Sequence, residues 1–435
     1  MSSNWPLKKI SDVAYFRNNK RIPLKSLDRA KRQGDFPYYG ASGVVDHIDD
    51  YKFDGSYLLI SEDGENLRTR KTPIAFQAHG KFWVNNHAHI LEEKEEGIID
   101  YLEYYFSILD LTPYITGAVQ PKLNKANLDT IEIPIPPLDE RKSINRTLNH
   151  LRDKISVNTQ TNKTLEAIAQ ALFKSWFVDF DPVKAKIATL ESGGSVEDAE
   201  LAAMSVIASK SLGELAELKQ TKPDVYDNLV QTAALFPAAM QESELGEIPE
   251  GGNVSTIEES FKVVMGQSPR GDTYNENEEG TLFYQGRAEF GWRFPSPRLH
   301  TTDPKRMASK GDVLMSVRAP VGDLNIALDD CCVGRGLCSL RHSSGSTTYS
   351  YYLLKHLQAS FNTFNGEGTV FGSINQKDLK SIQFISPAEQ LVNAYLDIAE
   401  PLDQEVKSLS TENITLSAVR ASLLPRLLSG ELEST

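Results

Sequence analysis

The sequence predicts an α+β protein with two strand-rich domains separated by an antiparallel pair of long helices, arranged as a pseudo-twofold internal repeat. When the chain is compared with itself at a shift of 251 positions, a window of twenty positions holds six identities. Two unrelated stretches of ordinary composition would share about one. The matches include Asn124 with Asn375 and Leu128 with Leu379. A long apolar heptad pattern also follows each block, so each half of the chain repeats one plan.

The strand-rich blocks are expected over residues 1–137 and 246–387. In the first block, a glycine precedes the β-type run 57–60, and in the second block a glycine precedes the run 313–315. Both runs are short, apolar and bounded by turn residues, as is typical of buried strands.

The long helices are expected over residues 138–178 and 388–428, because apolar side chains recur there at alternating spacings of three and four. Neither apolar face stabilises a lone helix in water, so the two should pack on each other as an antiparallel pair. Asn162 and Asn413 occupy matching positions that would set the register. The alternative is two unrelated amphipathic helices, each lying on its own domain. The residues predicted for the seam are Leu148, Leu151, Ile155, Asn162, Leu165, Leu172, Leu402, Val406, Leu409, Asn413, Leu416 and Leu423.

The remaining segments are an acidic helical connector, residues 179–245, and a short tail, residues 429–435. The net charge of the chain is −13, but residues 179–250 alone carry 14 acidic against 5 basic side chains. The repeated blocks are therefore almost neutral, and a neutral block can hold a basic face for phosphate contact. There is no signal-like or membrane-spanning apolar run, and the three cysteines form no Cys-x-x-Cys pair. These features predict a reduced, cytoplasmic protein without a membrane partner.

Sequence motifs for catalysis are missing. The chain has no Walker loop, no Gly-x-Gly-x-x-Gly opening a helix, and no Asn/Asp-Pro-Pro-Tyr/Phe motif of amino-methyltransferases. His87 and His89 could share one strand face, but two histidines without a cysteine pair do not complete a metal site. A structural or DNA-facing role is favoured for them. We therefore expect no catalytic residue and no metal ligand in this chain.

Basic side chains gather in one loop region of each block. Residues 17–32 carry seven Lys and Arg against one Asp, and residues 287–310 carry six against two acids. Asn18 and Asn19 lie inside the first patch, and asparagine suits bidentate contact with adenine. A single charge run is usually a solvated loop, but one in each repeat of an otherwise acidic protein indicates DNA binding.

Several short strings resemble those of the specificity (S) subunits of type I restriction–modification enzymes. They are Phe-Pro-Tyr-Tyr-Gly-Ala-Ser-Gly at 36–43, Ile-Pro-Ile-Pro-Pro-Leu at 133–138, Trp-Phe-Val-Asp-Phe at 176–180, Leu-Gly-Glu-Ile-Pro at 245–249 and Gly-Arg-Gly at 334–336. The resemblance spans the whole chain and rests on the order of these strings together with the duplication. One departure is Gly252, where the family usually has Trp, whereas the first block keeps Trp5.

The resemblance implies that each block is a target recognition domain that reads one half of a split site in double-stranded DNA. It also implies that the helices set the spacer and dock two methyltransferase (M) subunits, and that two restriction/translocase (R) subunits join them. Adenine methylation and ATP-dependent cleavage would then use S-adenosylmethionine, ATP and Mg in those partners, and no cofactor in this chain. The alternative is a coiled-coil scaffold that binds only protein partners.

Loop residues are the candidates for DNA contact: most of the Lys and Arg would grip phosphates, and a smaller set would read base edges. Arg318 and Arg335 are also candidates for pairing with a local carboxylate. The residues predicted to bind DNA are Arg17, Asn18, Asn19, Lys20, Arg21, Arg68, Arg70, Lys71, Arg270, Arg287, Arg293, Arg298, Arg306, Arg318 and Arg335.

Overall fold

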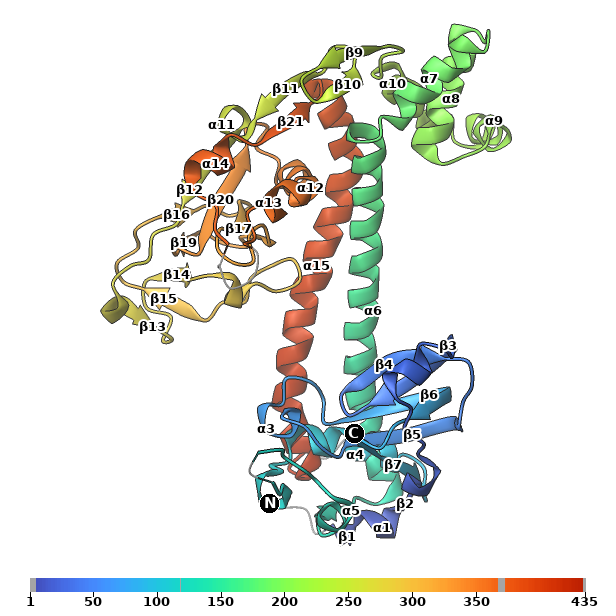
Figure 1. Cartoon of the computed structure of the whole chain (residues 1–435), viewed down its shortest axis with the longest axis vertical. Coiled ribbons are helices and arrows are strands. Elements are labelled where there is room, and N and C mark those ends of the chain that lie inside the picture. The colour runs from blue at the N-terminus through green and yellow to red at the C-terminus, as the bar shows by residue number, and fades with distance from the viewer. Residues whose placement is uncertain (1–4, 118, 367–371, 433–435) are drawn as a thin grey trace. The chain divides into compact units, whose positions relative to one another are not determined.

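The computed structural model of the chain describes residues 5–117, 119–366 and 372–432 (Figure 1). The chain divides into two compact units, Met1–Gln160 with Leu409–Thr435, and Thr161–Ser408. The first unit contains the first strand-rich block, and the second unit contains the second block. Each long helix contributes one half to each unit.

The first unit is centred on a six-stranded sheet with strand order β2-β7-β5-β6-β3-β4. Its pairings are antiparallel except for β3 with β6, which run parallel. A separate two-stranded sheet pairs β1 (Leu7–Lys9) with β8 (Glu132–Pro134), which brings the two ends of the repeat together. The six strands of the main sheet are β2 (Ala14–Phe16), β3 (Gln33–Gly40), β4 (Gly43–Ile48), β5 (Phe53–Ser61), β6 (Ala75–Val84) and β7 (Ala88–Glu93). The helices of the block are α1 (Ile10–Val13), η1 (Asn18–Lys20), α2 (Ser26–Arg29), α3 (Asn66–Thr69), α4 (Ile98–Ile108), η2 (Thr112–Tyr114) and α5 (Lys125–Leu128).

The apolar run 57–60 lies in strand β5, and its packing explains why the run is uninterrupted. Leu58 and Ile60 lie in a core shared with α4, whereas Leu59, which points the opposite way, lies in a second core with Phe53 and Phe82. Alternate side chains of a strand face opposite sides of the sheet, so a strand covered on both faces needs apolar residues at every position.

The second unit contains a four-stranded sheet, β12-β20-β17-β18, and a five-stranded sheet, β13-β15-β14-β19-β16. Two small antiparallel sheets pair β9 with β10 and β11 with β21. The strands are β9 (Met240–Ser243), β10 (Gly246–Pro249), β11 (Asn253–Thr256), β12 (Phe261–Met265), β13 (Tyr274–Asn275), β14 (Thr281–Tyr284), β15 (Leu299–Thr301), β16 (Met307–Ala308), β17 (Val313–Ser316), β18 (Leu324–Ile326), β19 (Cys331–Val333), β20 (Leu337–His342) and β21 (Gln383–Ser386). The helices of this block are α11 (Ile257–Ser260), η3 (Gly271–Thr273), η4 (Arg287–Glu289), α12 (Thr347–His356), α13 (Gln358–Asn362) and α14 (Gln376–Lys380).

The internal repeat is confirmed by matching pieces of the two blocks. The pairing of β1 with β8 recurs as β11 with β21, and the parallel pair β3–β6 recurs as the parallel pair β14–β19. Asn124 caps α5 by accepting from a backbone N–H three residues on, and Asn375 caps α14 in the same way. Gly368 and Val370, which the shift of 251 positions pairs with Gly117 and Val119, lie outside the described residues.

The long helices α6 (Leu138–Phe177) and α15 (Glu389–Leu428) pack against each other within each unit (Figure 1). In the first unit, Asn158 donates to the Asn413 side chain at 3.0 Å, and Leu148 shares a core with Leu427. In the second unit, the Tyr395 hydroxyl donates to the Ala169 carbonyl at 3.2 Å. The order of these contacts confirms the antiparallel pair, and every residue expected in the seam is buried or half-buried.

An insert of four helices follows α6 in the second unit. They are α7 (Asp181–Glu191), α8 (Val196–Ala208), α9 (Leu212–Thr221) and α10 (Pro223–Ala234). The last three share a small core of their own, whereas Val183 of α7 lies in the large core of the second unit. Ser195 and Ser211 start α8 and α9 with capping boxes, which satisfy backbone donors that a helix start leaves free. In the described part of the chain, no helix is long and apolar enough to cross a membrane.

Candidate nucleic-acid interface

Four loops of the first unit meet at one end of β5 and β7. We name them loop cluster 1: residues 17–21, 62–71, 85–87 and 116–124, of which residue 118 is not described. Main-chain hydrogen bonds tie them together: Glu62 N–H donates to the His87 carbonyl at 2.9 Å, and Leu123 N–H donates to the Glu62 carbonyl at 2.7 Å. The loops are therefore held by backbone pairing, which leaves their side chains open to variation.

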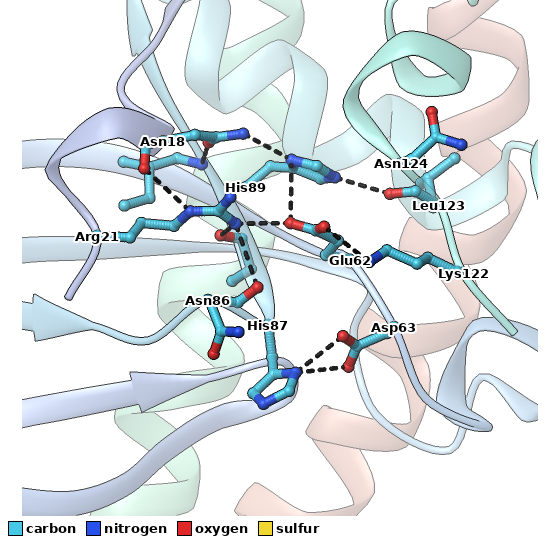
Figure 2. Close-up of polar contacts among 12 residues, drawn as sticks. Asn18, Arg21, Glu62, Asp63, Asn86, His87, His89, Lys122, Leu123 and Asn124 are labelled. Atoms are coloured by element: carbon cyan, nitrogen blue, oxygen red, sulfur yellow. Dashed lines mark hydrogen bonds and ion pairs between the residues drawn. The ribbon is translucent and has the colours of Figure 1, made fainter. Parts of the chain in front are cut away.

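The Glu62 carboxylate is the centre of loop cluster 1 (Figure 2). It pairs with Arg21 at 2.6 Å and with Lys122 at 3.4 Å, and Arg21 also donates to the Ala88 carbonyl at 2.8 Å. Burial by itself would raise the pKa of the Glu62 carboxyl, but the hydrogen bond from Arg21 and the nearby cations lower it below the ordinary value. Glu62 therefore stays anionic and anchors two cations.

His89 is buried beside this pair and has both ring nitrogens engaged. Its Nε2 lies 2.7 Å from the Leu123 carbonyl, so Nε2 carries the proton, and Nδ1 then accepts from the Asn18 amide at 2.9 Å (Figure 2). Burial lowers the pKa of His89, which favours this neutral form. His87 lies nearer the surface, with its Nδ1 2.8 Å from an Asp63 oxygen. Within the described residues, no group of three or more His, Cys, Asp and Glu could hold a metal ion.

Asn18 is a correction to the sequence prediction. Its amide nitrogen is bound to His89, and its oxygen accepts from the Ile90 N–H at 2.9 Å. With both ends of the amide used inside the protein, Asn18 has no bidentate edge to offer to adenine. Its role is to hold η1 against β7, whereas the neighbouring Asn19 is exposed.

The other cations predicted in the first block divide into paired and unpaired groups. Arg17 pairs with Glu92, and Arg70 donates to the carbonyls of Ser107 and Leu109. Arg68 is exposed and donates to the Gly117 carbonyl at 2.8 Å. Lys20 and Lys71 are exposed and make no side-chain hydrogen bond or ion pair with any described residue.

Lys122 was missed by the sequence analysis, although its side chain is 51% exposed within loop cluster 1. It lies two residues before Asn124, inside the window that recurs at the shift of 251 positions. The recurrence of that window was a signal for the loop but not for the lysine, because the position paired with Lys122 in the second repeat is Ser373.

The second unit has an equivalent set of loops, which we name loop cluster 2: residues 266–270, 317–323, 334–336 and 372–374. Val317 N–H donates to the Gly336 carbonyl at 3.0 Å, and Ile374 N–H donates to the Val317 carbonyl at 3.1 Å. These two bonds repeat those of Glu62 with His87 and Leu123. The same main-chain frame is thus built twice.

Loop cluster 2 carries three of the predicted arginines. Arg318 and Arg335 are exposed, and neither side chain has a hydrogen-bond or ion-pair partner among the residues that the structure describes. The alternative that either arginine pairs with a local carboxylate is therefore not observed among these residues. Arg270 is also exposed and pairs with Asp272 at 2.6 Å.

The remaining predicted arginines of the second block lie outside loop cluster 2. Arg287 pairs with Asp323, Arg298 lies 3.3 Å from Glu289, and Arg306 is exposed. Arg293 is a correction, because its side chain is buried and paired, and it cannot reach a duplex.

Two repeats that present cation-bearing loops, each joined to a long helix, are the arrangement expected of a protein that binds nucleic acid through two domains. The family model described as the type I restriction modification DNA specificity domain matches residues 2–167 and 249–416. The chain therefore belongs to the family of type I restriction–modification specificity subunits, and the resemblance seen in the sequence is confirmed.

Individual relatives agree with this assignment. The chain is 31% identical over 337 residues to the HindI specificity subunit of Haemophilus influenzae, covering 72% of this chain and 71% of that protein. It is 28% identical over 338 residues to the putative MjaX specificity subunit of Methanocaldococcus jannaschii, covering 76% and 67%. The solved S subunit from M. genitalium shares the fold, with a TM-score of 0.59 at 13% identity over 98% of this chain and 96% of that one.

Proposed function

We propose that this chain is the sequence-reading subunit of a type I restriction–modification complex, in which loop clusters 1 and 2 each contact one half of a bipartite DNA site. The observation that carries the proposal is the repeated main-chain frame, which gathers cations at the same sheet end in both units. Loops on a rigid sheet are suited to follow phosphates while neighbouring side chains read base edges.

Within this proposal the exposed, unpaired side chains make the first contacts. Lys20 and Lys71 would grip phosphates for the first repeat, and Arg318 and Arg335 for the second. Asn19 stands beside Lys20 and remains the amide suited to adenine. Arg17, Arg21, Arg68, Arg70, Arg270, Arg287 and Arg298 stay in the proposed set with the internal bonds described above, and Arg306 stays in it as an exposed cation.

The helix pair is proposed to set the unread spacer and to dock two M subunits, with two R subunits completing the complex. Support comes from large apolar side chains exposed along both helices, namely Val157, Ile168, Ile398, Ile414 and Val419. Such residues commonly mark protein contacts. S-adenosylmethionine, ATP and Mg are proposed to bind the partners, in the cytoplasm, while this chain performs no chemical step.

The test is to reconstitute the complex with its methyltransferase partners and map methylated adenines across a genome. We expect a split motif, and we expect Arg318→Ala to weaken or relax one half of it. Lys222→Ala is the matched control, because Lys222 is an exposed cation in the helical insert. Methylation without sequence preference would contradict the proposal and favour a scaffold that binds only proteins.

A further inference from the structure

Arg293 is a charged side chain that is only 2% exposed within the second unit. Its guanidinium pairs with Asp403 of α15 at 2.6 Å and with Glu166 of α6 at 3.4 Å. It also donates to the Tyr352 hydroxyl of α12, 3.4 Å away. One side chain from a loop therefore contacts three helices of the unit.

Tyr351 completes the surroundings of this guanidinium. The guanidinium carbon lies 3.8 Å from the centroid of the Tyr351 ring, and the Tyr351 hydroxyl donates to Glu166 at 3.1 Å. A planar guanidinium that is stacked on a ring and paired with two carboxylates has few alternative positions. The network therefore defines where the backbone at residue 293 lies.

Stability alone does not account for this arrangement. Removing charged groups from water is unfavourable. A protein in which well-packed apolar side chains replace a buried ion pair is often equally stable. Two buried atoms of the network, Arg293 Nε and Asp403 Oδ2, have no hydrogen-bond partner in the described part of the chain. The network is therefore better explained by the position in which it holds the loop that carries Arg293.

The loop that carries Arg293 links β14 to β15 and is tied to β18. The Gly291 N–H donates to the Asn325 side chain at 3.1 Å, and the Arg293 carbonyl accepts from Ile326 N–H at 3.0 Å. While Arg293 is buried, the adjacent Trp292 is 47% exposed. Because Arg293 is held inside the unit, the neighbouring Trp292 is held at the surface.

This loop has no counterpart among the residues that the structure describes in the first unit. Only residues 41–42 separate β3 from β4, whereas residues 285–298 separate β14 from β15. Trp292 lines an open hollow together with Arg287, Asp323 and Lys355. The two cations pair with Asp323 and Glu166, so the exposed ring is the group of this hollow that is suited to apolar contact with a base edge.

We propose that Arg293 is a positioning residue that clamps the loop 285–298 to α6, α12 and α15, and that Trp292, held by this clamp, is a specificity-determining side chain of the second repeat. The proposal rests on the proposed DNA-reading function. A change at the clamp then alters base discrimination, although Arg293 itself does not touch DNA.

The experiment uses the complete complex reconstituted with its methyltransferase partners. Arg293→Met combined with Asp403→Leu replaces the ion pair by apolar side chains. The matched control is Lys186→Met with Glu200→Leu, which removes an ion pair of 2.6 Å between a buried lysine and a half-buried glutamate in the helical insert. We expect the clamp variant to keep its melting temperature within a few degrees and to lose about tenfold in preference for the correct over a mismatched sequence, at one half-site only.

Trp292→Ala should lose preference at the same half-site, and the control variant should behave as wild type. Arg293→Lys keeps the charge but loses the planar fork, so it should reproduce part of the loss without leaving a carboxylate unpaired. Unchanged preference in these variants would overturn the proposal, and so would an equal loss at both half-sites. A wild-type complex without sequence preference would instead overturn the DNA-reading function itself.

Discussion

Loop clusters 1 and 2 share a main-chain frame but differ in what stands at its centre. Glu62 occupies the central position in the first cluster and gathers Arg21 and Lys122, whereas the buried Val317 occupies it in the second. The next residue in the second cluster, Arg318, is exposed without a side-chain partner among the described residues. Main-chain hydrogen bonds therefore build the same loop arrangement in both repeats, and the side chain at its centre determines how many cations form ion pairs within it.

The largest expected effect breaks the centre of loop cluster 1. Arg21→Met leaves Glu62 half-buried with Lys122 as its remaining cation, so the free energy of unfolding should fall by about 2–3 kcal/mol. Chemical denaturation of the purified chain measures the change. The control is Arg17→Met, which removes the more exposed pair with Glu92 and should lower the free energy of unfolding clearly less. Equal losses of unfolding free energy in the two variants would show that the Arg21–Glu62 pair is no more stabilising than the exposed Arg17–Glu92 pair.

A second expected effect concerns the start of each repeat. Trp5 donates to Glu140 of α6 at 3.1 Å, whereas the corresponding pair in the second repeat is Gly252 and Leu391. Gly252 lines a cavity of about 70 Å³ together with Trp176. Gly252→Trp should fill this cavity and raise the free energy of unfolding by about 1–2 kcal/mol.

The same denaturation measurement tests Gly252→Trp, with Gly213→Trp on the exposed face of α9 as the control. A Cβ at Gly252 lies 3.1 Å from the Pro249 carbonyl, so a small backbone shift is required, whereas a Cβ at Gly213 meets nothing within 4 Å. A lower stability of the Gly252 variant would show that the cavity is not the counterpart of the Trp5 site.

The difference between paired and unpaired cations predicts a smaller effect on DNA affinity. Arg335→Ala should weaken binding by about 1 kcal/mol on every sequence and lower the salt slope by about one, if Arg335 contacts a phosphate. Lys122→Ala should weaken binding less, because Lys122 already pairs with Glu62. Titrations of the complex with DNA at several salt concentrations give both values. A larger loss of affinity for Lys122→Ala than for Arg335→Ala would contradict the interpretation that cations paired within the protein contribute less to DNA binding.

The smallest expected effect is on pH dependence. Because the folded-state pKa of Glu62 is lowered, its contribution to stability is present above its ordinary pKa of about 4.3 and is lost as the pH falls through the lower folded value. Melting temperatures between pH 3 and pH 6 should therefore decline more steeply towards acid for the wild type than for Glu62→Gln. Parallel curves would show that Glu62 titrates as an ordinary surface carboxylate.

The fold was largely predictable, whereas the candidate site was predictable only in outline. The heptad spacing predicted the antiparallel helices, and the recurrence of Asn124 as Asn375 anticipated two equivalent helix caps. The charge runs in the sequence located the basic loops. They also led us to expect Asn18 and Arg293 at the DNA-facing surface, whereas both side chains are bound inside the protein. A run of charge in the sequence does not show that one of its arginines pairs with a carboxylate on a helix that is distant in the sequence.

The sequence by itself determined the repeat, the paired helices and the class of protein, because periodicity and recurrence are properties of the chain. Only the tertiary structure decided which cations remain exposed. That outcome depends on partners far away in sequence, such as Asp403 for Arg293 and Glu62 for Arg21. Buried charges must find an opposite charge or a hydrogen bond, and the fold alone supplies it.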